Sequence, residues 1–412
     1  MATQFTAAVK KGGSVGTDCD YLTLASAETG LQNDLTAATS MVFSISANTT
    51  PTLVAGDAVT GNTSGATGTC VLVNYGKTQV WIKAISGTFQ SGETVKKTSD
   101  AGVTVTLSNA GDTVICGIRC RAGTADTTAA AFSGWTTGAS NYIRIYSDES
   151  DAMATTIYTT SGYRLEVTGT CLDIREEYVR VERISIKFTS PASPNAISAV
   201  LLLAGATSDI RLTGCYIKGV MHASNTSVVN GVFCSGSQAQ KIINCIFDGF
   251  TNVGNTANAG YTQDINSGAS RVYCCLAINC ATGYKSLDAS VFLKNCAYDG
   301  GTSGNQVGFQ GTPHSTSNYN ASTDATAPGV NSRQSQTFTY VGAGDYAFAT
   351  TDTGAVDFGT DLSADGFPVT TDFNGTTRDG TWDIGPVNVT AVNPYSPPIL
   401  PFVTIQFKPV VS

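Results

Sequence analysis

One pattern of apolar and polar residues recurs five times between about Tyr178 and Gly300. In each copy, apolar and polar residues alternate, the alternation slips by one position, and it then resumes. The aligned position is held by Ile184, Cys215, Cys245, Cys275 and Cys296, at intervals of 31, 30, 30 and 21 residues. Alternation of this kind places one row of side chains inward and one outward on a strand. We therefore expect each copy to form two short strands that meet at a bend.

Each interval leaves room for a third strand. Candidates are Ala199–Leu203, Gly231–Cys234, Ala281–Lys285 and Gln306–Phe309. A repeat of 21 to 31 residues is typical of stacked supersecondary units. Successive copies would hydrogen-bond to one another about 4.8 Å apart, with inward residues in register. A Cys or Asn at a bend would then lie above its counterpart and form an internal column.

These phrases resemble the pectate-lyase-like superfamily of right-handed parallel β-helices. The segment Asn-Tyr-Ile-Arg-Ile-Tyr-Ser-Asp at 141–148 resembles an early coil of such proteins. The resemblance covers roughly residues 112–390. It implies an all-β fold built as a right-handed parallel β-helix, with coils that resume at Thr113–Cys120. It says little about activity, because this scaffold carries many functions.

The residues before the repeats have a different pattern. Leu24, Ala27, Leu31 and Leu35 fall near one face of a helix, which predicts an amphipathic cap within Asp18–Leu35. Met41–Ala47 is typical of a strand. Two similar phrases follow, Ala55–Gly61 and Ser91–Lys97, and they flank strand patterns at Thr69–Val73 and Gln79–Ile85. We expect a small inserted antiparallel β-module here. The run at 61–69 resembles small β-modules of bacteriophage virion proteins.

The residues after the repeats are less regular. Tyr319–Ser335 is rich in Asn, Ser and Thr and predicts a loop. Segments at 345–348, 372–378 and 382–386 resemble the closing part of β-helix families and are expected to fold over the final coil. Five prolines after Val392 favour an extended tail that docks on its own body or on another subunit. The predicted division is an N-terminal segment with its helix, an inserted module, a β-helix with a closing segment, and a tail, at 1–49, 50–110, 111–390 and 391–412.

Composition narrows the classes of partner. Charged residues make up 13% of the chain and the net charge is −8. Phosphate neutralisation needs clustered Lys and Arg, and the Lys pairs at 10–11 and 96–97 are short, so no nucleic-acid partner is expected. No apolar run approaches the length of a membrane span. The first residues lack the apolar core of a secretory signal, which suggests assembly in a host cytoplasm and release by lysis as part of a virion.

Twelve cysteines raise the question of disulfides. Cys116 and Cys120 share a predicted strand four positions apart, too far for a bridge. Most of the others fall on inward or bend positions, where Cys behaves as a small apolar residue. We expect mostly reduced, stacked thiols, although a pair such as Cys215 and Cys245 leaves a few bridges open. No Cys-x-x-Cys pair occurs, and His222 and His314 stand apart from the cysteines, so no metal or cofactor is predicted.

Candidate catalytic groups are scattered. A lyase would need acidic calcium ligands and a basic residue on one sheet face. The candidates are Asp173, Glu176, Glu177, Asp248 and Asp299, with Lys187 and Lys218. Outward positions of a solenoid are polar in any case, and Asp-Gly is ordinary turn chemistry. A hydrolase of the polygalacturonase type would resemble its family through paired Asp near a histidine, and no Asp-Asp pair occurs here. A row of Tyr216, Tyr273, Tyr284 and Tyr298 is a candidate for stacking on sugars. The prediction is that no residue is catalytic, cofactor-binding or metal-binding.

The leading hypothesis is a non-enzymatic bacteriophage virion component: a fibre, spike or capsid-decoration protein that forms a homotrimer. It would contact capsid or tail proteins and host surface polysaccharide by shape and multivalency. The alternatives are a tailspike depolymerase that cleaves host polysaccharide and a host-surface adhesin without catalysis. Release of oligosaccharides separates the depolymerase from the other two.

Overall fold

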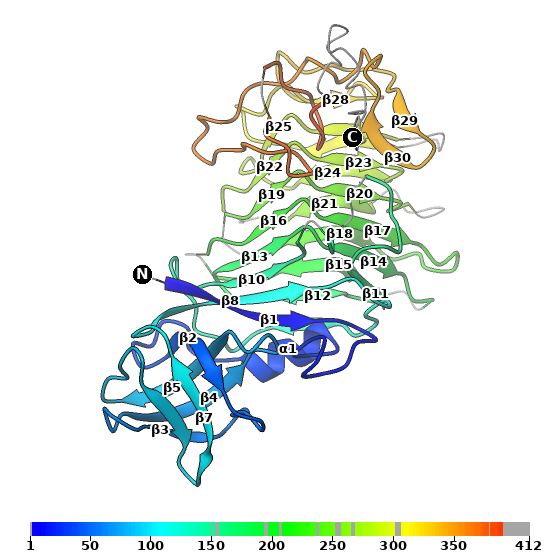
Figure 1. Ribbon diagram of the computed structural model, residues 1–412. Helices are drawn as coiled ribbons and strands as arrows, with labels where there is room; N and C mark the ends of the chain where they lie inside the picture. Colours follow the sequence, from blue (N-terminus) through cyan, green and yellow to red (C-terminus); the bar gives the residue numbers. More distant parts are fainter. Residues whose placement is uncertain are drawn as a thin grey trace, which may run out of the picture.

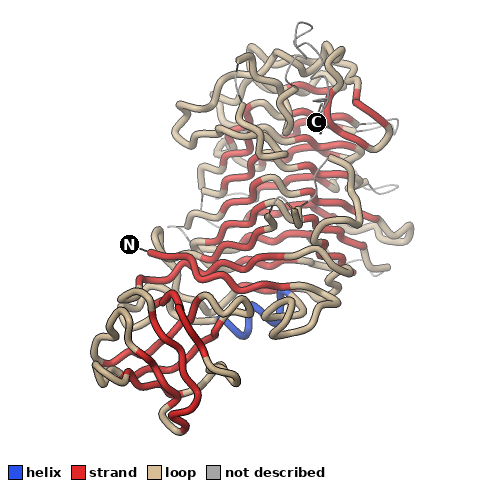
Figure 2. Tube along the Cα trace, in the orientation of Figure 1, coloured by secondary structure: helices blue, strands red, loops and turns tan. Residues whose placement is uncertain are grey.

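The fold is all-β, with one short helix (Figures 1 and 2). The computed structural model describes residues 2–148, 150–152, 156–192, 197–205, 208–235, 239–251, 257–264, 268–300, 306–378 and 380–389. The tail after residue 390 lies outside the described residues, so its predicted docking stays a prediction.

Three sheets of parallel strands form the body of the molecule. The parallel strands of sheet 1 are β8 (Asp112–Cys120), β10 (Ile143–Tyr146), β13 (Val179–Glu182), β16 (Arg211–Thr213), β19 (Lys241–Ile243), β22 (Arg271–Tyr273) and β25 (Phe292–Lys294), with β1 (Ala2–Val9) paired to β8. Those of sheet 2 are β11 (Arg164–Thr168), β14 (Ser185–Thr189), β17 (Tyr216–Val220), β20 (Ile246–Asp248), β23 (Leu276–Ile278), β26 (Ala297–Asp299) and β28 (Ala321–Ser322). Those of sheet 3 are β9 (Ala130–Phe132), β12 (Leu172–Ile174), β15 (Ile197–Leu202), β18 (Val229–Cys234), β21 (Ala259–Gln263), β24 (Thr282–Ser286) and β27 (Val307–Gly311).

From β13 to β27 the chain passes through sheets 1, 2 and 3 in turn, and we call each pass a coil. Every coil adds one strand to each sheet, as the rows of parallel arrows in Figure 1 show. Val181 pairs with Leu212, and Leu212 with Ile242, so equivalent residues of successive coils stack. All three side chains are fully buried in one continuous core. The core therefore runs along the axis of the stack.

The predicted bend between two short strands is confirmed in all five copies. One residue at each bend has left-handed backbone dihedrals: Arg183, Gly214, Asn244, Cys274 and Asn295, with φ between 51° and 62°. This residue breaks the in–out alternation, which is why the pattern slips by one there. The four candidate third strands are also confirmed, as β15, β18, β24 and β27. A fifth, β21, was missed because Ala-Gly-Tyr-Thr-Gln shows no apolar alternation.

The aligned cysteines form the expected internal column. Cys215, Cys245, Cys275 and Cys296 are fully buried, and the amide of Cys245 donates to Sγ of Cys275 at 3.4 Å. All twelve cysteines lie in the described part of the chain, and all are buried free thiols. The bridges that the sequence left open are therefore not formed. Burial raises the pKa of the Cys234 and Cys280 thiols to about 12, so they stay protonated at neutral pH.

The predicted amphipathic helix is α1 (Leu24–Leu31). Thr23 caps its N-terminus by accepting the amide of Ser26 at 3.1 Å. Leu24, Ala27 and Leu31 are fully buried, as expected, and the helix packs against β1, β8 and β9; Leu35 joins them beyond the helix. The helix lies beneath β1 and β12 in Figure 1. It covers apolar residues at the start of the core.

The predicted antiparallel module is a closed six-stranded barrel. Its strands are β2 (Met41–Asn48), β3 (Ala58–Gly61), β4 (Thr67–Val73), β5 (Gln79–Ser86), β6 (Thr94–Lys97) and β7 (Asp100–Leu107), and pairing of β2 with β7 closes it. The barrel has its own apolar core. It begins earlier than the predicted module because β2, placed in the N-terminal segment, pairs with β5 and β7. The two similar phrases pair with each other as β3 and β6.

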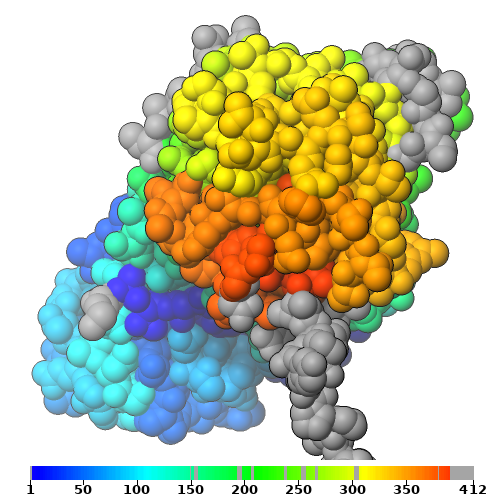
Figure 3. Space-filling view, turned by 90° about the horizontal axis from the view of Figure 1, so that it is seen from above, coloured from blue at the N-terminus to red at the C-terminus, as the bar shows by residue number. Residues whose placement is uncertain are grey.

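The C-terminal residues were expected to fold over the final coil, and their position differs. We call residues 338–378 and 380–389 the strap; it contains the hairpin β29 (Tyr340–Gly342) and β30 (Asp345–Phe348). The strap packs along the outer side of several successive coils (Figure 3, orange to red). The reason is an outward apolar row, listed by coil as Tyr216, Ile246, Leu276 and Ala297, that needs a cover.

The predicted loop at 319–335 closes the last coil instead. Asp324 and Thr326 accept the backbone amides of Gly308 and Phe309 at 2.7 and 2.9 Å. Ala327 is buried in the main core. The free edge of the last strand in sheet 3 is therefore partly satisfied by side chains of this loop.

Candidate functional site

The acidic residues considered as catalytic candidates do not converge. Asp173 lies on sheet 3 and pairs with Arg175 at 2.8 Å, whereas Asp248 and Asp299 lie on sheet 2. Asp248 is 3% exposed and accepts Tyr216 Oη at 2.9 Å and Lys218 Nζ at 3.0 Å. Asp299 accepts Tyr340 Oη of the strap at 3.0 Å. These carboxylates hold the structure together.

The remaining candidates also have structural contacts. Glu176 accepts the amide of Trp135 at 2.9 Å, and Lys187 pairs with Glu166 at 3.1 Å. Glu177 precedes β13, and its backbone carbonyl accepts the amide of Asp209. Among the described residues, no group of three or more His, Cys, Asp or Glu could hold a metal ion.

The proposed tyrosine row for sugar stacking is wrong. Its four members, Tyr216, Tyr273, Tyr284 and Tyr298, are each 1% exposed. Tyr284 and Tyr298 donate to buried carbonyls of Ala297 and Cys280. Tyr216 and Tyr273 lie under the strap. The four rings thus contact the core or the strap rather than solvent.

A row of basic residues crosses the outer face of sheet 1. Strand pairing places the following residues opposite one another in successive coils: Arg144, Arg180, Arg211, Lys241 and Arg271. Neighbouring strands of a sheet lie about 4.8 Å apart, so the cations form a closely spaced column. Phe292 occupies the next position and ends the row. We call these five cations the basic row.

Two carboxylates neutralise part of the basic row. Glu182 accepts Nε and Nη2 of Arg144 at 2.9 and 2.7 Å. Asp209 binds both Arg211 and Lys241. Burial alone would raise the pKa of Asp209, but hydrogen bonds from Arg211 and Lys241 outweigh burial and lower it to about 2. Asp209 therefore stays charged at any neutral pH.

Arg180 lies between these pairs without an acid of its own. Its guanidinium carbon is 3.6 Å from the ring centroid of Tyr142. Burial lowers the pKa of Arg180, and the positive charge of Arg211 lowers it further. Arg183, at the bend that follows β13, has a φ of 58°, a conformation that favours Gly or Asn. Among the described residues, neither arginine has an ion-pair partner.

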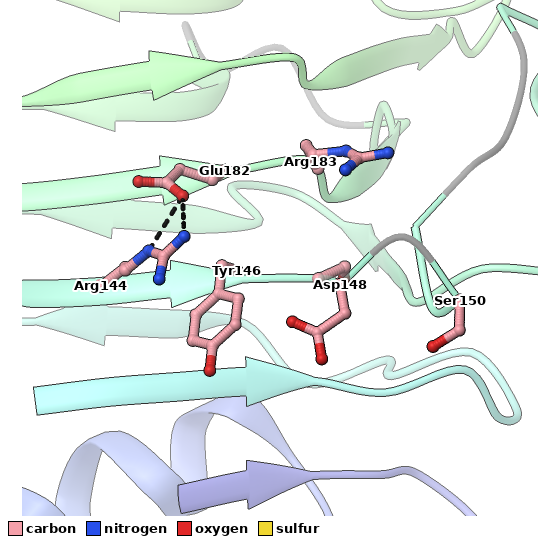
Figure 4. Close-up of a pocket in the computed structure, with 7 residues that line it drawn as sticks. Arg144, Tyr146, Asp148, Ser150, Glu182 and Arg183 are labelled. Carbon is pink, nitrogen blue, oxygen red and sulfur yellow. Dashed lines mark hydrogen bonds and ion pairs between the residues drawn. The ribbon is translucent and has the colours of Figure 1, made fainter. Parts of the chain in front are cut away.

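Two adjoining grooves open beside the basic row. One, of about 500 Å³, is lined by Arg144, Tyr146, Ser147, Asp148, Ser150, Glu182 and Arg183. Figure 4 shows Arg144 reaching across the strands to Glu182, with Tyr146 and Asp148 on the same side. The other, of about 300 Å³, has Arg180, Glu182, Arg183 and Arg211 on one side and strap residues 367–371 on the other. Glu182 and Arg183 line both grooves, which therefore adjoin at these two residues.

The strap supplies an aromatic wall. The ring centroid of Phe367 is 4.8 Å from the guanidinium of Arg211 and 5.0 Å from Nζ of Lys241. Asp365 pairs with Lys294 at 2.6 Å and accepts Tyr273 Oη at 3.1 Å, which anchors this part of the strap. The groove combines positive charge with an apolar surface, a combination suited to binding rather than to acid–base chemistry.

Sequence reasoning missed this site, although the signal is present in the phrases. Four of the five copies carry a basic residue four positions before the aligned position: Arg180, Arg211, Lys241 and Arg271. Alignment of the copies would have placed them in one column. The premise that basic residues are not clustered is therefore wrong for sheet 1. The absence of a nucleic-acid partner, which rested on that premise, stays a prediction.

Comparison of the chain with protein-family models, with curated proteins and with solved structures finds no match in any of the three. In the described part of the chain, no helix has both the length and the apolar character needed to span a membrane.

Proposed function

We propose that the protein is a right-handed parallel β-helix of the pectate-lyase-like kind and a non-enzymatic structural and adhesive component of a bacteriophage virion. The groove along the basic row carries the proposal. It is a long, charged contact surface on a rigid stack of strands, and it supports recognition of a polar polymer such as a host surface glycan. Such a component acts by shape and by many weak contacts.

The state of the carboxylates supports a binding function over a catalytic one. Glycosidases use two carboxyl groups that flank the bond to be broken. Glu182 and Asp148 line the larger groove, but Arg144 and Arg119 engage them at 2.7 and 2.6 Å. Those contacts occupy oxygens that the reaction would need. A tailspike depolymerase remains the alternative, because both carboxylates border an open groove.

The test incubates the purified chain with capsule and lipopolysaccharide of candidate hosts. The proposal predicts that the chain sediments with cells and releases no oligosaccharide. Release that disappears in Glu182→Gln would establish the depolymerase instead. A native protein that never co-purifies with phage particles would refute the virion assignment.

We further propose that the protein is a homotrimer assembled through its C-terminal tail, residues 391–412, and that it contacts capsid or tail proteins of the virion. The solution mass of the chain with and without residues 393–412 tests this. A trimer that becomes a monomer on truncation supports assembly through the tail. A monomer in both cases favours single copies docked on a larger lattice.

A further inference from the structure

Two cations of the groove have no acidic partner, whereas their neighbours do. Arg144 pairs with Glu182, and Arg211 shares Asp209 with Lys241. Arg180 and Arg183 form no ion pair with any residue that the structure describes. In the smaller groove, three guanidiniums face one carboxylate. Partly buried like charges repel one another and lose hydration, which destabilises the free protein and favours a bound anion.

The backbone at Arg183 is a second, independent observation. Three of the other coils place Gly214, Asn244 or Asn295 at the same bend, residue types that tolerate left-handed dihedrals, and the fourth places the buried Cys274 there. Arginine gains nothing from this conformation by itself. Its side chain, however, lines both grooves at the point where they meet. Unfavourable backbone conformations of this kind are typical of functional positions.

We propose that Arg180, Arg183 and Arg211 bind a tetrahedral oxyanion, a phosphate or sulfate ester, in the 300 Å³ groove between β13, β16 and the strap. A guanidinium is a planar fork that binds two oxygens of an anion. One guanidinium already hydrogen-bonds to both oxygens of a carboxylate, whereas a tetrahedral ester presents three oxygens and can bind several guanidinium groups. Thr213, Thr370 and Thr371 line the same groove and add hydroxyl groups.

The wall opposite the arginines fits the rest of such a ligand. Phe367 presents a ring beside the cations, and Pro368 and Val369 continue the apolar surface. A sugar ring that carries the ester would pack there. The assignment of the anion to a host glycan rests on the proposed adhesive function. The binding of a tetrahedral anion in the groove is independent of that function. The predicted ligand is thus a phosphorylated or sulfated glycan.

The first experiment titrates the full chain with inorganic phosphate, sulfate and acetate by calorimetry at low salt. Phosphate and sulfate are expected to bind at least tenfold more tightly than acetate, and added sodium chloride should weaken binding. Arg180→Gln and Arg183→Gly are each expected to weaken phosphate binding at least tenfold. Glycine suits the bend, so Arg183→Gly should keep the thermal stability of the parent.

The matched control is Arg175→Gln, which removes one positive charge just after β12 of sheet 3, where Arg175 is exposed. It should bind phosphate like the parent. Equal affinity for acetate and phosphate, or parental binding in both groove variants, would overturn the proposal. If Arg175→Gln also loses phosphate binding, the loss reflects the lower positive charge of the whole protein, and the proposal is overturned as well.

Polymers distinguish the sources of the anion. Polyphosphate and dextran sulfate should compete with inorganic phosphate, and polygalacturonate, which carries only carboxylates, should compete at least tenfold less well. A polygalacturonate that competes equally would refute the tetrahedral assignment. If both arginine variants still adhere to host cells, the arginine groove is not the adhesive contact, although the proposed adhesive function stands. Binding of phosphate without adhesion or particle association would refute the proposed function alone.

Discussion

Sheets 1 and 2 are built from the same repeated phrase, yet their outer faces differ. The outer face of sheet 2 carries an apolar row that the strap buries. The outer face of sheet 1 carries the basic row, much of which borders open grooves. The stack of coils is the same for both, because the inward residues are apolar in both. The comparison teaches that outward residues, which the stack leaves free, decide which face is covered and which can bind a ligand.

The strap is held to the stack by the residues at the bends as well as by apolar packing. Asn295 Nδ2 donates to the carbonyl of Thr360 at 2.8 Å, and its Oδ1 accepts the amide of Thr360 at 2.9 Å. Asn244 donates to the carbonyl of Thr371 at 2.7 Å. Arg378, 6% exposed, donates to the carbonyls of Gly385 and Pro386. The amides at the bends therefore replace the hydrogen bonds that a sheet would have given the strap.

The largest expected effect is at the covered face. Phe348, 1% exposed, packs with Phe338 and Tyr340 over the last coils. Phe348→Ala should lower the free energy of unfolding by about 3–5 kcal/mol, because it removes a buried ring and leaves a cavity. Urea denaturation measures this. Val330→Ala, at a site 94% exposed, is the control and should change stability by less than about 0.5 kcal/mol. A small effect at Phe348 would show that the strap contributes little to the fold.

The next effect is at the bend. Asn295→Gly keeps the left-handed conformation and removes both hydrogen bonds to Thr360. We expect a loss of about 1–3 kcal/mol, because partly buried backbone groups of Thr360 lose their partners. Faster proteolysis within the strap should accompany the loss. Unchanged proteolysis would mean that apolar packing alone holds this segment.

A smaller effect concerns pH at the open face. The folded-state pKa of Asp209 is lowered to about 2 from 3.8. Its contribution to stability is therefore complete above pH 3.8 and is lost as pH falls through 2. Asp209 is partly exposed, so screening by solvent limits the contribution to about 1 kcal/mol. Asp209→Asn should lower the free energy of unfolding by that amount at pH 7. Its free energy of unfolding should also fall less steeply than that of the parent as the pH drops from about 4 to 2. An unchanged pH dependence would show that Arg211 and Lys241 do not depend on this carboxylate.

The smallest effect is expected at the unpaired cation. Arg180→Gln should change the free energy of unfolding by less than about 0.5 kcal/mol, because Arg180 has no ion pair to lose and relief of repulsion from Arg211 offsets lost packing on Tyr142. Urea denaturation measures this too. Destabilisation by more than about 1 kcal/mol would mean that Arg180 is structural, which removes the contrast between the two faces.

Much of the stack could be predicted from the sequence, because the inward residues repeat. Ile184 and the four aligned cysteines mark the bends, and four of the five third strands from β15 to β27 follow from apolar runs. The strand β1 was missed because its pattern, Ala-Thr-Gln-Phe-Thr-Ala-Ala-Val, stands far from its partner β8 in the chain. The position of the strap was missed for a similar reason. The strap packs against outward residues of successive coils. Each coil contributes only one or two of these apolar residues, so the sequence of a single coil does not show that they form a continuous row.

The candidate site depends most on tertiary structure. Arg180, Arg211 and Lys241 are 30 or 31 residues apart, and their positions in the phrase already predict which strand face they share. Three features depend on the tertiary structure alone. They are the faces that the strap covers, the cations that form ion pairs with a carboxylate, and the position of Phe367. The physical reason is that alternation and repeat length are local properties set by the backbone. Coverage and charge pairing depend on contacts between segments that lie far apart in the sequence.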